Sequence, residues 1–103
     1  MAYRVEFTPR ALHDLNGIYA KVVREAPYRG PQWFDRLEHS ILSLSHFPER
    51  CAVVPKFSTA KRTVREFLFG CRRHVYRVYF AIINDVVGVL HVRHGARKKP
   101  RMV

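Results

Sequence analysis

Acidic residues are scarce in the second half of this 103-residue chain. Residues 61–103 contain only Glu66 and Asp85 against eleven lysines and arginines, whereas residues 1–60 contain six acidic and eight basic residues. Hard cations bind clustered carboxylates, so we expect neither a metal nor another cofactor. The concentrated positive charge, carried by fourteen arginines in the whole chain, predicts a polyanion or a strongly acidic protein as partner. A solubilising surface is the alternative, but it rarely needs such a concentration.

The chain also lacks the segments typical of membrane and secreted proteins. No apolar run approaches the roughly 20 residues that span a bilayer, and the first ten residues have no hydrophobic core of a secretion signal. Cys51 and Cys71 form neither a CxxC pair nor a metal-binding spacing. We therefore expect a cytoplasmic protein with no membrane partner and two unpaired thiols, a Cys51–Cys71 disulfide being the alternative.

No familiar catalytic motif is present: the chain has no GxSxG, HExxH or Walker sequence. Its histidines and arginines are compatible with metal-free RNA cleavage, in which an imidazole moves protons and arginines stabilise charge on the phosphate. His94 is the main candidate acid or base, close in sequence to Arg97, and His91 is a weaker one. Binding of phosphate or of an acidic partner without catalysis is the alternative, and composition favours it.

The hydrophobic pattern predicts one α+β domain over residues 1–103. Residues 3–7 alternate as a strand, and Thr8-Pro9 begins a helix that runs to about Arg24. A second helix lies between Gly30-Pro31 and Phe47-Pro48, followed by a loop with a short extended piece at 51–54. Strands at 63–69, 75–83 and 87–93 complete a β-α-α-β-β-β order. We expect the helical hairpin to cover one face of a mostly antiparallel four-stranded sheet, leaving the other face open.

The strands at 75–83 and 87–93 form a hairpin whose register decides what its basic residues face. A three-residue loop over 84–86 pairs Ile83 with Val87 and separates apolar from charged residues; a two-residue loop mixes them. We therefore expect one face to hold Val78, Phe80, Ile82, Leu90 and Val92, and the other to hold Arg77, Tyr79, His91 and Arg93. On that second face Tyr79 has two alternative roles, stacking on a nucleic-acid base or packing at an edge.

Three stretches resemble the RelE/ParE family of type II toxin–antitoxin toxins: YRVEFTPRALHDLNGI, the helix end at Leu44–Pro48, and YRVYFAIINDVVGVLHVRHGARK. The resemblance covers nearly the whole chain and implies the same element order. It also implies a growth inhibitor that is neutralised by a cognate antitoxin, for which we expect an acidic or amphipathic segment on the sheet face. RelE-like members cleave mRNA in the ribosome without a metal, whereas ParE-like members inhibit DNA gyrase and are not nucleases.

The resemblance assigns roles to individual residues. Arg77 and Arg97 match phosphate-stabilising arginines of the RelE-like nucleases, and His94 can replace part of their acid–base function. The remaining basic-region candidates would bind nucleic acid or a partner: Arg65, Arg72, Arg73, Tyr79, His91, Arg93, Lys98 and Lys99. RelE also has two catalytic lysines, where this chain has Arg65 and Phe67, and a catalytic tyrosine that the tail KKPRMV lacks. We expect ribosome-dependent mRNA cleavage, with gyrase inhibition or a non-toxic, antitoxin-binding member as alternatives.

Overall fold

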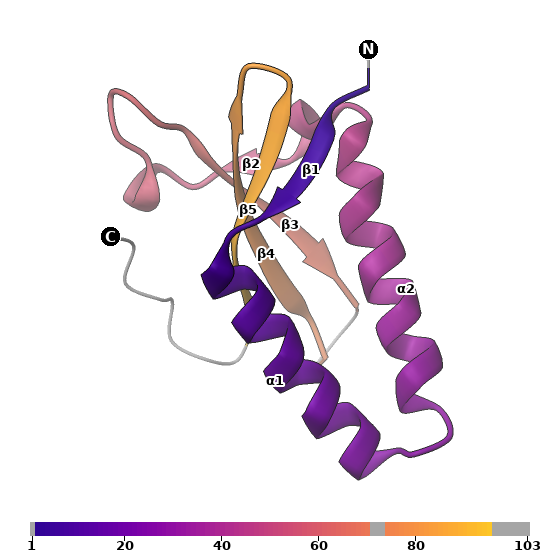
Figure 1. Cartoon of the computed structure of the whole chain (residues 1–103). Helices are drawn as coiled ribbons and strands as arrows, with labels where there is room; N and C mark the ends of the chain where they lie inside the picture. The colour runs from indigo at the N-terminus through magenta and orange to yellow at the C-terminus, as the bar shows by residue number, and fades with distance from the viewer. Residues whose placement is uncertain (1, 71–73, 96–103) are drawn as a thin grey trace.

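The computed structural model describes residues 2–70 and 74–95. Two helices cover one face of a five-stranded sheet whose strand order is β1-β5-β4-β3-β2 (Figure 1). Within these residues β1 and β5 pair in parallel, and the other neighbouring strands pair antiparallel. The elements are β1 (Arg4–Phe7), α1 (Pro9–Glu25), α2 (Gly30–Leu42), β2 (Ala52–Val53), β3 (Val64–Phe69), β4 (Tyr76–Ile83) and β5 (Val86–His94), with short 3-10 turns at Ser43–Ser45, Pro48–Arg50 and Pro55–Phe57.

The predicted α+β class and element order are confirmed, but the predicted count of four strands is wrong. The extended piece expected near residues 51–54 forms β2, which pairs Ala52 with Glu66 of β3. The sheet therefore has five strands. A two-residue strand carries too little periodicity to be distinguished from a loop in the sequence.

Helix α1 begins where its capping signal predicts. The backbone N–H of Ala11 donates to Thr8 Oγ1 at 3.1 Å, and Pro9 occupies the first turn. The Thr8 hydroxyl lies within hydrogen-bonding distance of the Val89 carbonyl of β5, at 3.0 Å. One side chain thus caps α1 and ties its start to the central part of the sheet.

The β4–β5 hairpin combines the two registers considered from the sequence. Next to the turn Ile83 pairs with Val86, so the loop has two residues, and Asn84 adopts a left-handed conformation with φ of 57°. The predicted pairing of Ile83 with Val87 is therefore wrong. Leu90 is an extra residue, a β-bulge, after which Tyr79 pairs with His91 and the expected register resumes.

The bulge preserves the predicted separation of faces, with one exception. The helix face of the sheet, meaning the face that α1 and α2 cover, carries Val78, Phe80, Val89 and Val92 in the main core. The second face carries Arg77, Tyr79, His91 and Arg93. Leu90, expected on the helix face, instead packs with Tyr79 on the second face.

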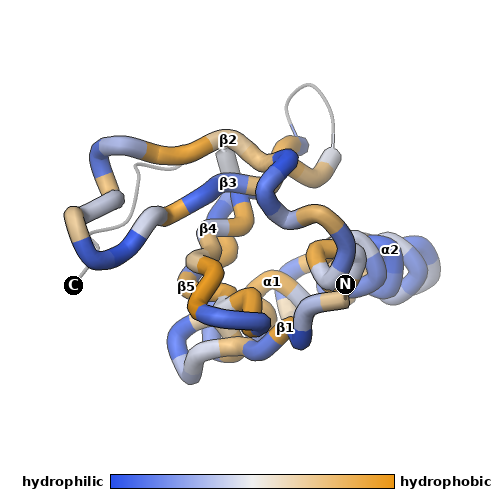
Figure 2. Tube along the Cα trace, turned by 90° about the horizontal axis from the view of Figure 1, so that it is seen from above, coloured by the Kyte–Doolittle hydropathy of each residue, from blue (hydrophilic) through white to orange (hydrophobic). Residues whose placement is uncertain are grey.

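The second face is partly covered rather than open. Val54 and Phe57, from the segment between β2 and β3, pack with Val64 and Tyr79 in a second hydrophobic cluster. Figure 2 shows the largely hydrophobic β4 and β5 between α2 on one side and this segment on the other. At the other end of β4, Arg77 remains partly exposed on this face.

The two helices approach closely at Gly30, at the start of α2. A Cβ at this position would lie 2.5 Å from the Val22 carbonyl oxygen of α1, which is a backbone atom that cannot rotate away. At Gly17, in the middle of α1, a Cβ would meet no atom within 4 Å.

We predict opposite effects for alanine at these two glycines. Gly30→Ala lowers the free energy of unfolding by about 1–3 kcal/mol because the helices must separate. Gly17→Ala raises it by about 0.5–1 kcal/mol because alanine is favoured inside a helix. Urea denaturation of both variants checks this, and equal effects of the same sign would contradict the helix approach described above.

Candidate functional site

Arg77 lies on the second face and is held by an acidic neighbour. Its Nη1 donates to Oε1 of Glu66, on β3, at 2.6 Å. The Arg77 side chain remains 32% exposed and that of Glu66 15%. The hydrogen bond with Glu66 raises the pKa of Arg77, so the guanidinium is a permanent cation.

Arg93 lies directly opposite Arg77 on the neighbouring strand. Like charges in a cross-strand pair repel each other, and Glu66 is the only carboxylate paired with either of them in the described part of the chain. The Nε of Arg93 is buried with no hydrogen-bond partner among the described residues. The pair therefore forms a site with excess positive charge that an anion would stabilise.

Tyr79 is fully buried beneath the covering segment, with 0% exposure. The Phe57 ring packs edge-on against it, with centroids 5.4 Å apart. Burial, followed by the nearby Glu66 charge, raises the pKa of Tyr79. This position supports the packing alternative and leaves no ring face for stacking on a base, since residues 54–64 fold over the strand.

Arg65, predicted to bind nucleic acid or a partner, does not lie on the face of Arg77. It pairs with Phe80 and therefore lies on the helix face. Its guanidinium donates to the carbonyl oxygens of Glu49 at 3.1 Å and Cys51 at 2.8 Å. These bonds hold the chain before β2 against β3, so Arg65 has a structural role at the sheet edge.

His91 shares the second face with Arg77, but its ring turns towards α1. Its side chain is 14% exposed, and Nδ1 lies 3.7 Å from the Asp14 carboxylate. Burial lowers the pKa of His91, Asp14 opposes that shift, and the charges of Arg10 and Arg93 add to it. Asp14 also accepts the backbone N–H of Val92 at 3.1 Å and pairs with Arg10 at 3.3 Å.

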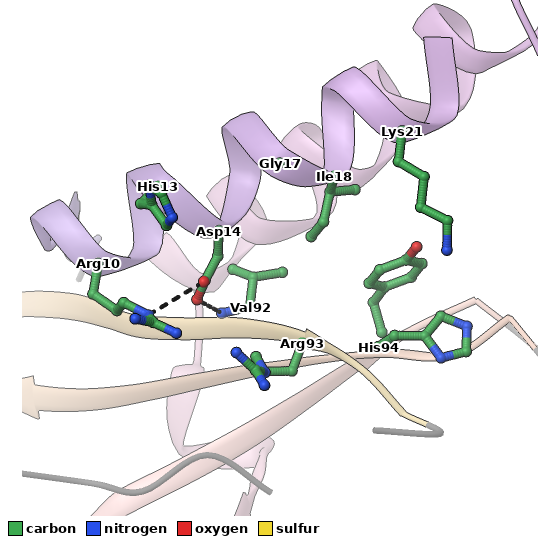
Figure 3. Close-up of a pocket in the computed structure, with 10 residues that line it drawn as sticks. Arg10, His13, Asp14, Gly17, Ile18, Lys21, Val92, Arg93 and His94 are labelled. Carbon is green, nitrogen blue, oxygen red and sulfur yellow. Dashed lines mark hydrogen bonds and ion pairs between the residues drawn. The ribbon is translucent and has the colours of Figure 1, made fainter. Parts of the chain in front are cut away.

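His94 lies on the helix face, because it pairs with Tyr76, whose ring is 5.0 Å away. With Arg93 it lines a hollow of about 420 Å³ between α1 and the end of β5 (Figure 3). Arg10, Asp14 and Lys21 form the α1 wall of this hollow. Thus the candidate catalytic residues Arg77 and His94 lie on opposite faces of the sheet.

The α1 wall was not predicted as part of a site. Its signal is present in the sequence, because Arg10, Asp14, Gly17 and Lys21 recur every three or four residues and share one side of a helix. Five predicted site residues lie outside the described residues: Arg72, Arg73, Arg97, Lys98 and Lys99.

The structure adds two observations on metals and membranes. Within residues 2–70 and 74–95, no three His, Cys, Asp or Glu side chains cluster as metal ligands would. No helix in the same residues combines the length and hydrophobicity needed to cross a bilayer.

Cys51 is a buried free thiol, whose pKa is raised chiefly by that burial. Cys71 lies outside the described residues.

The lowered pKa of His91 predicts a pH-dependent contribution to stability. Between its folded pKa and the higher unfolded one, the unfolded state binds more protons, so stability falls as pH drops through this window. Urea denaturation at about pH 7.5 and about pH 5.5 should show a larger loss for the wild type than for His91→Gln. Equal losses of stability in the wild type and in His91→Gln would contradict the burial of a neutral imidazole. The matched control is His39→Gln, on an exposed helix surface.

Comparison with known proteins agrees with this architecture. The sequence model described as "ParE toxin of type II toxin-antitoxin system, parDE" matches residues 5–99. The chromosomal ParDE toxin–antitoxin system of P. aeruginosa is similar in structure, with a TM-score of 0.69, 17% identity, and 90% of this chain and 96% of that chain covered.

Two RelE structures share the fold. The archaeal RelE–RelB complex from Pyrococcus horikoshii OT3 has a TM-score of 0.61 at 17% identity, covering 95% of this chain and 100% of that chain. A mutant E. coli RelE toxin in the free state has a TM-score of 0.58 at 18% identity, covering 93% of this chain and 86% of that chain. No curated protein sequence matches significantly. The family match spans almost the entire chain. This protein therefore belongs to the ParE toxin family of type II toxin–antitoxin systems.

Proposed function

We propose that this toxin stops growth by inhibiting DNA gyrase and does not cleave RNA. The observation that carries the proposal is the position of Arg77 and His94 on opposite faces of the sheet. Metal-free cleavage requires a proton-transferring group and a charge-stabilising group at one phosphate, each within hydrogen-bond reach. Two side chains separated by the thickness of a sheet do not meet this requirement.

The neighbours of Arg77 support the same conclusion. Glu66 occupies one of its guanidinium nitrogens at 2.6 Å, so an entering phosphate would meet a carboxylate beside its binding group. His91 is on the correct face, but its ring is largely buried and its Nδ1 faces Asp14. Neither arrangement favours acid–base chemistry at a phosphate bound by Arg77.

Gyrase inhibition needs only a binding surface, and the resemblance to ParE-like toxins provides the target. The exposed part of Arg77, the opposite Arg93 and the accessible Leu68, which is 53% exposed, form a mixed cationic and apolar patch on the second face. Patches of this kind are typical of protein interfaces, where arginine is enriched. The cognate antitoxin is expected to compete with the target, and its acidic side chains would complement the same arginines.

Ribosome-dependent mRNA cleavage is the second candidate. It is favoured by the cross-strand pair of Arg77 and Arg93 and by the excess of basic residues in positions 61–103. Such charge suits ribosomal RNA as well as an acidic protein. The two candidates therefore differ in chemistry rather than in electrostatics.

Two assays on the same purified toxin separate these candidates. We expect it to inhibit gyrase supercoiling, and we expect primer extension on translated mRNA to show no codon-linked cuts. Codon-linked cuts with unaltered supercoiling would establish the second candidate. Normal growth during expression without antitoxin would contradict both and support a non-toxic member.

Substitution of His94 also distinguishes RNA cleavage from gyrase inhibition. Loss of a general acid or base costs a nuclease about 10²–10⁴-fold, so His94→Gln should abolish growth arrest if this chain cleaves RNA. Under gyrase inhibition we expect His94→Gln to change the half-inhibitory concentration by less than about tenfold. His46→Gln, at an exposed position near the end of α2, is the matched control.

A further inference from the structure

The hollow beside His94 continues into a second hollow on the helix side of the molecule. The second one has a volume of about 570 Å³ and lies between α1, α2 and the start of β4. The two hollows share Lys21, Tyr76 and His94. We call the two adjoining hollows together the basic groove, and its cations are Arg10, Lys21, Arg29, Arg36 and Arg93.

The charge of the basic groove is poorly neutralised by the protein itself. Of the acidic residues that line it, Asp14 is occupied by Arg10 and by the backbone of Val92. Glu25 forms no ion pair within the described residues, and neither do Lys21, Arg29 and Arg36. Unpaired cations that line one depression create a field that attracts polyanions.

The groove also contains aromatic side chains. Trp33, the only tryptophan in the chain, and Tyr76 both line the larger hollow, with ring centroids 5.2 Å apart. Trp33 is only partly buried. Tyr76 is buried, so the accessible part of Trp33 is the stacking surface that this basic channel offers to an unpaired base.

The length of the α1 wall suits a short strand. Arg10 and Lys21 are eleven residues apart on α1, or about 17 Å at 1.5 Å per residue. Gly17 leaves a gap between them, with no atom within 4 Å of an added Cβ. Arg93 lines the hollow opposite this helix wall, and Arg29 and Arg36 lie beyond Lys21, so the cations are spread along a path that the phosphates of a short single strand can follow.

We propose that the basic groove binds single-stranded nucleic acid. The phosphates contact Lys21 and the arginines of the two helices, and a base lies against the accessible part of Trp33. An acidic protein segment would satisfy the charges as well, but it has no planar base to stack on the accessible part of Trp33. This site follows α1 onto the helix face and shares Arg93 with the patch around Arg77. The inference does not depend on whether gyrase is the target.

The sole tryptophan provides a reporter located in the groove. Titration of the full chain with an oligothymidylate of about ten nucleotides should quench Trp33 fluorescence, with an affinity that falls as salt rises. The slope of log affinity against log salt is expected near −0.7 per phosphate contact, or about −2 to −3 for three or four contacts. A polyglutamate of equal charge should bind more weakly and leave the fluorescence unchanged.

Paired variants test the assignment to this groove. Lys21→Ala with Arg36→Ala should weaken oligothymidylate binding about tenfold or more and reduce the salt slope by about 1.4. Lys61→Ala with Arg62→Ala removes the same charge from the segment that covers the second face, and should weaken binding less than threefold. All four side chains have no hydrogen bond or ion pair in the described structure, so both variants should remain folded.

Three results would overturn the proposal. They are absence of quenching by oligothymidylate, equal weakening by the two double variants, and polyglutamate binding as tight as that of the oligonucleotide. The last result would assign the groove to an acidic protein partner. Because these readouts contain neither gyrase nor ribosomes, they fail or succeed independently of the toxin's target.

Discussion

The extra residue at Leu90 determines which side chains reach each face of the sheet. Without it, the tight turn at Asn84-Asp85 would impose a register in which His91 and Arg93 share a face with Val78 and Phe80. The bulge shifts the pairing by one residue, so that Val92 returns to the core and Arg93 lies opposite Arg77. The bulge thus allows one hairpin to have a two-residue turn and also to keep its apolar and charged side chains on separate faces of the sheet.

The hydrogen bonds of α1 hold this arrangement in place on both sides of the bulge. Thr8 contacts the carbonyl of Val89 just before Leu90, and Asp14 accepts the N–H of Val92 just after it. In the described residues, strand β1 pairs with residues 86–89 of β5, and Asp14 satisfies a backbone donor that lies beyond this pairing. The same carboxylate faces His91, and this links the helix wall to the charged face.

Much of the fold follows from local patterns, because strand alternation and the Thr8-Pro9 cap are short-range features. The bulge was not predictable in the same way. The register of a two-residue turn holds next to the turn, and the register of a three-residue turn holds beyond Leu90, so neither register describes the whole hairpin. Tyr79 is buried because Val54 and Phe57 pack over it from a segment that is distant in sequence. That segment has no clear periodicity, so its position over the strand could not be predicted. The separation of His94 from Arg77 did have a signal, because adjacent residues of a strand point to opposite faces and Arg93 shares the face of Arg77.

Arg77 and His94, on opposite faces of the sheet, should not act on a common phosphate, and a double-mutant cycle can show this. The half-inhibitory concentration for growth arrest would be measured for Arg77→Gln, His94→Gln and the double variant. Residues on opposite faces with separate roles should give additive free-energy changes, within about 0.5 kcal/mol. If each single change alone removes as much activity as the double change, the two residues work as one catalytic unit, which would contradict their placement on opposite faces with separate roles.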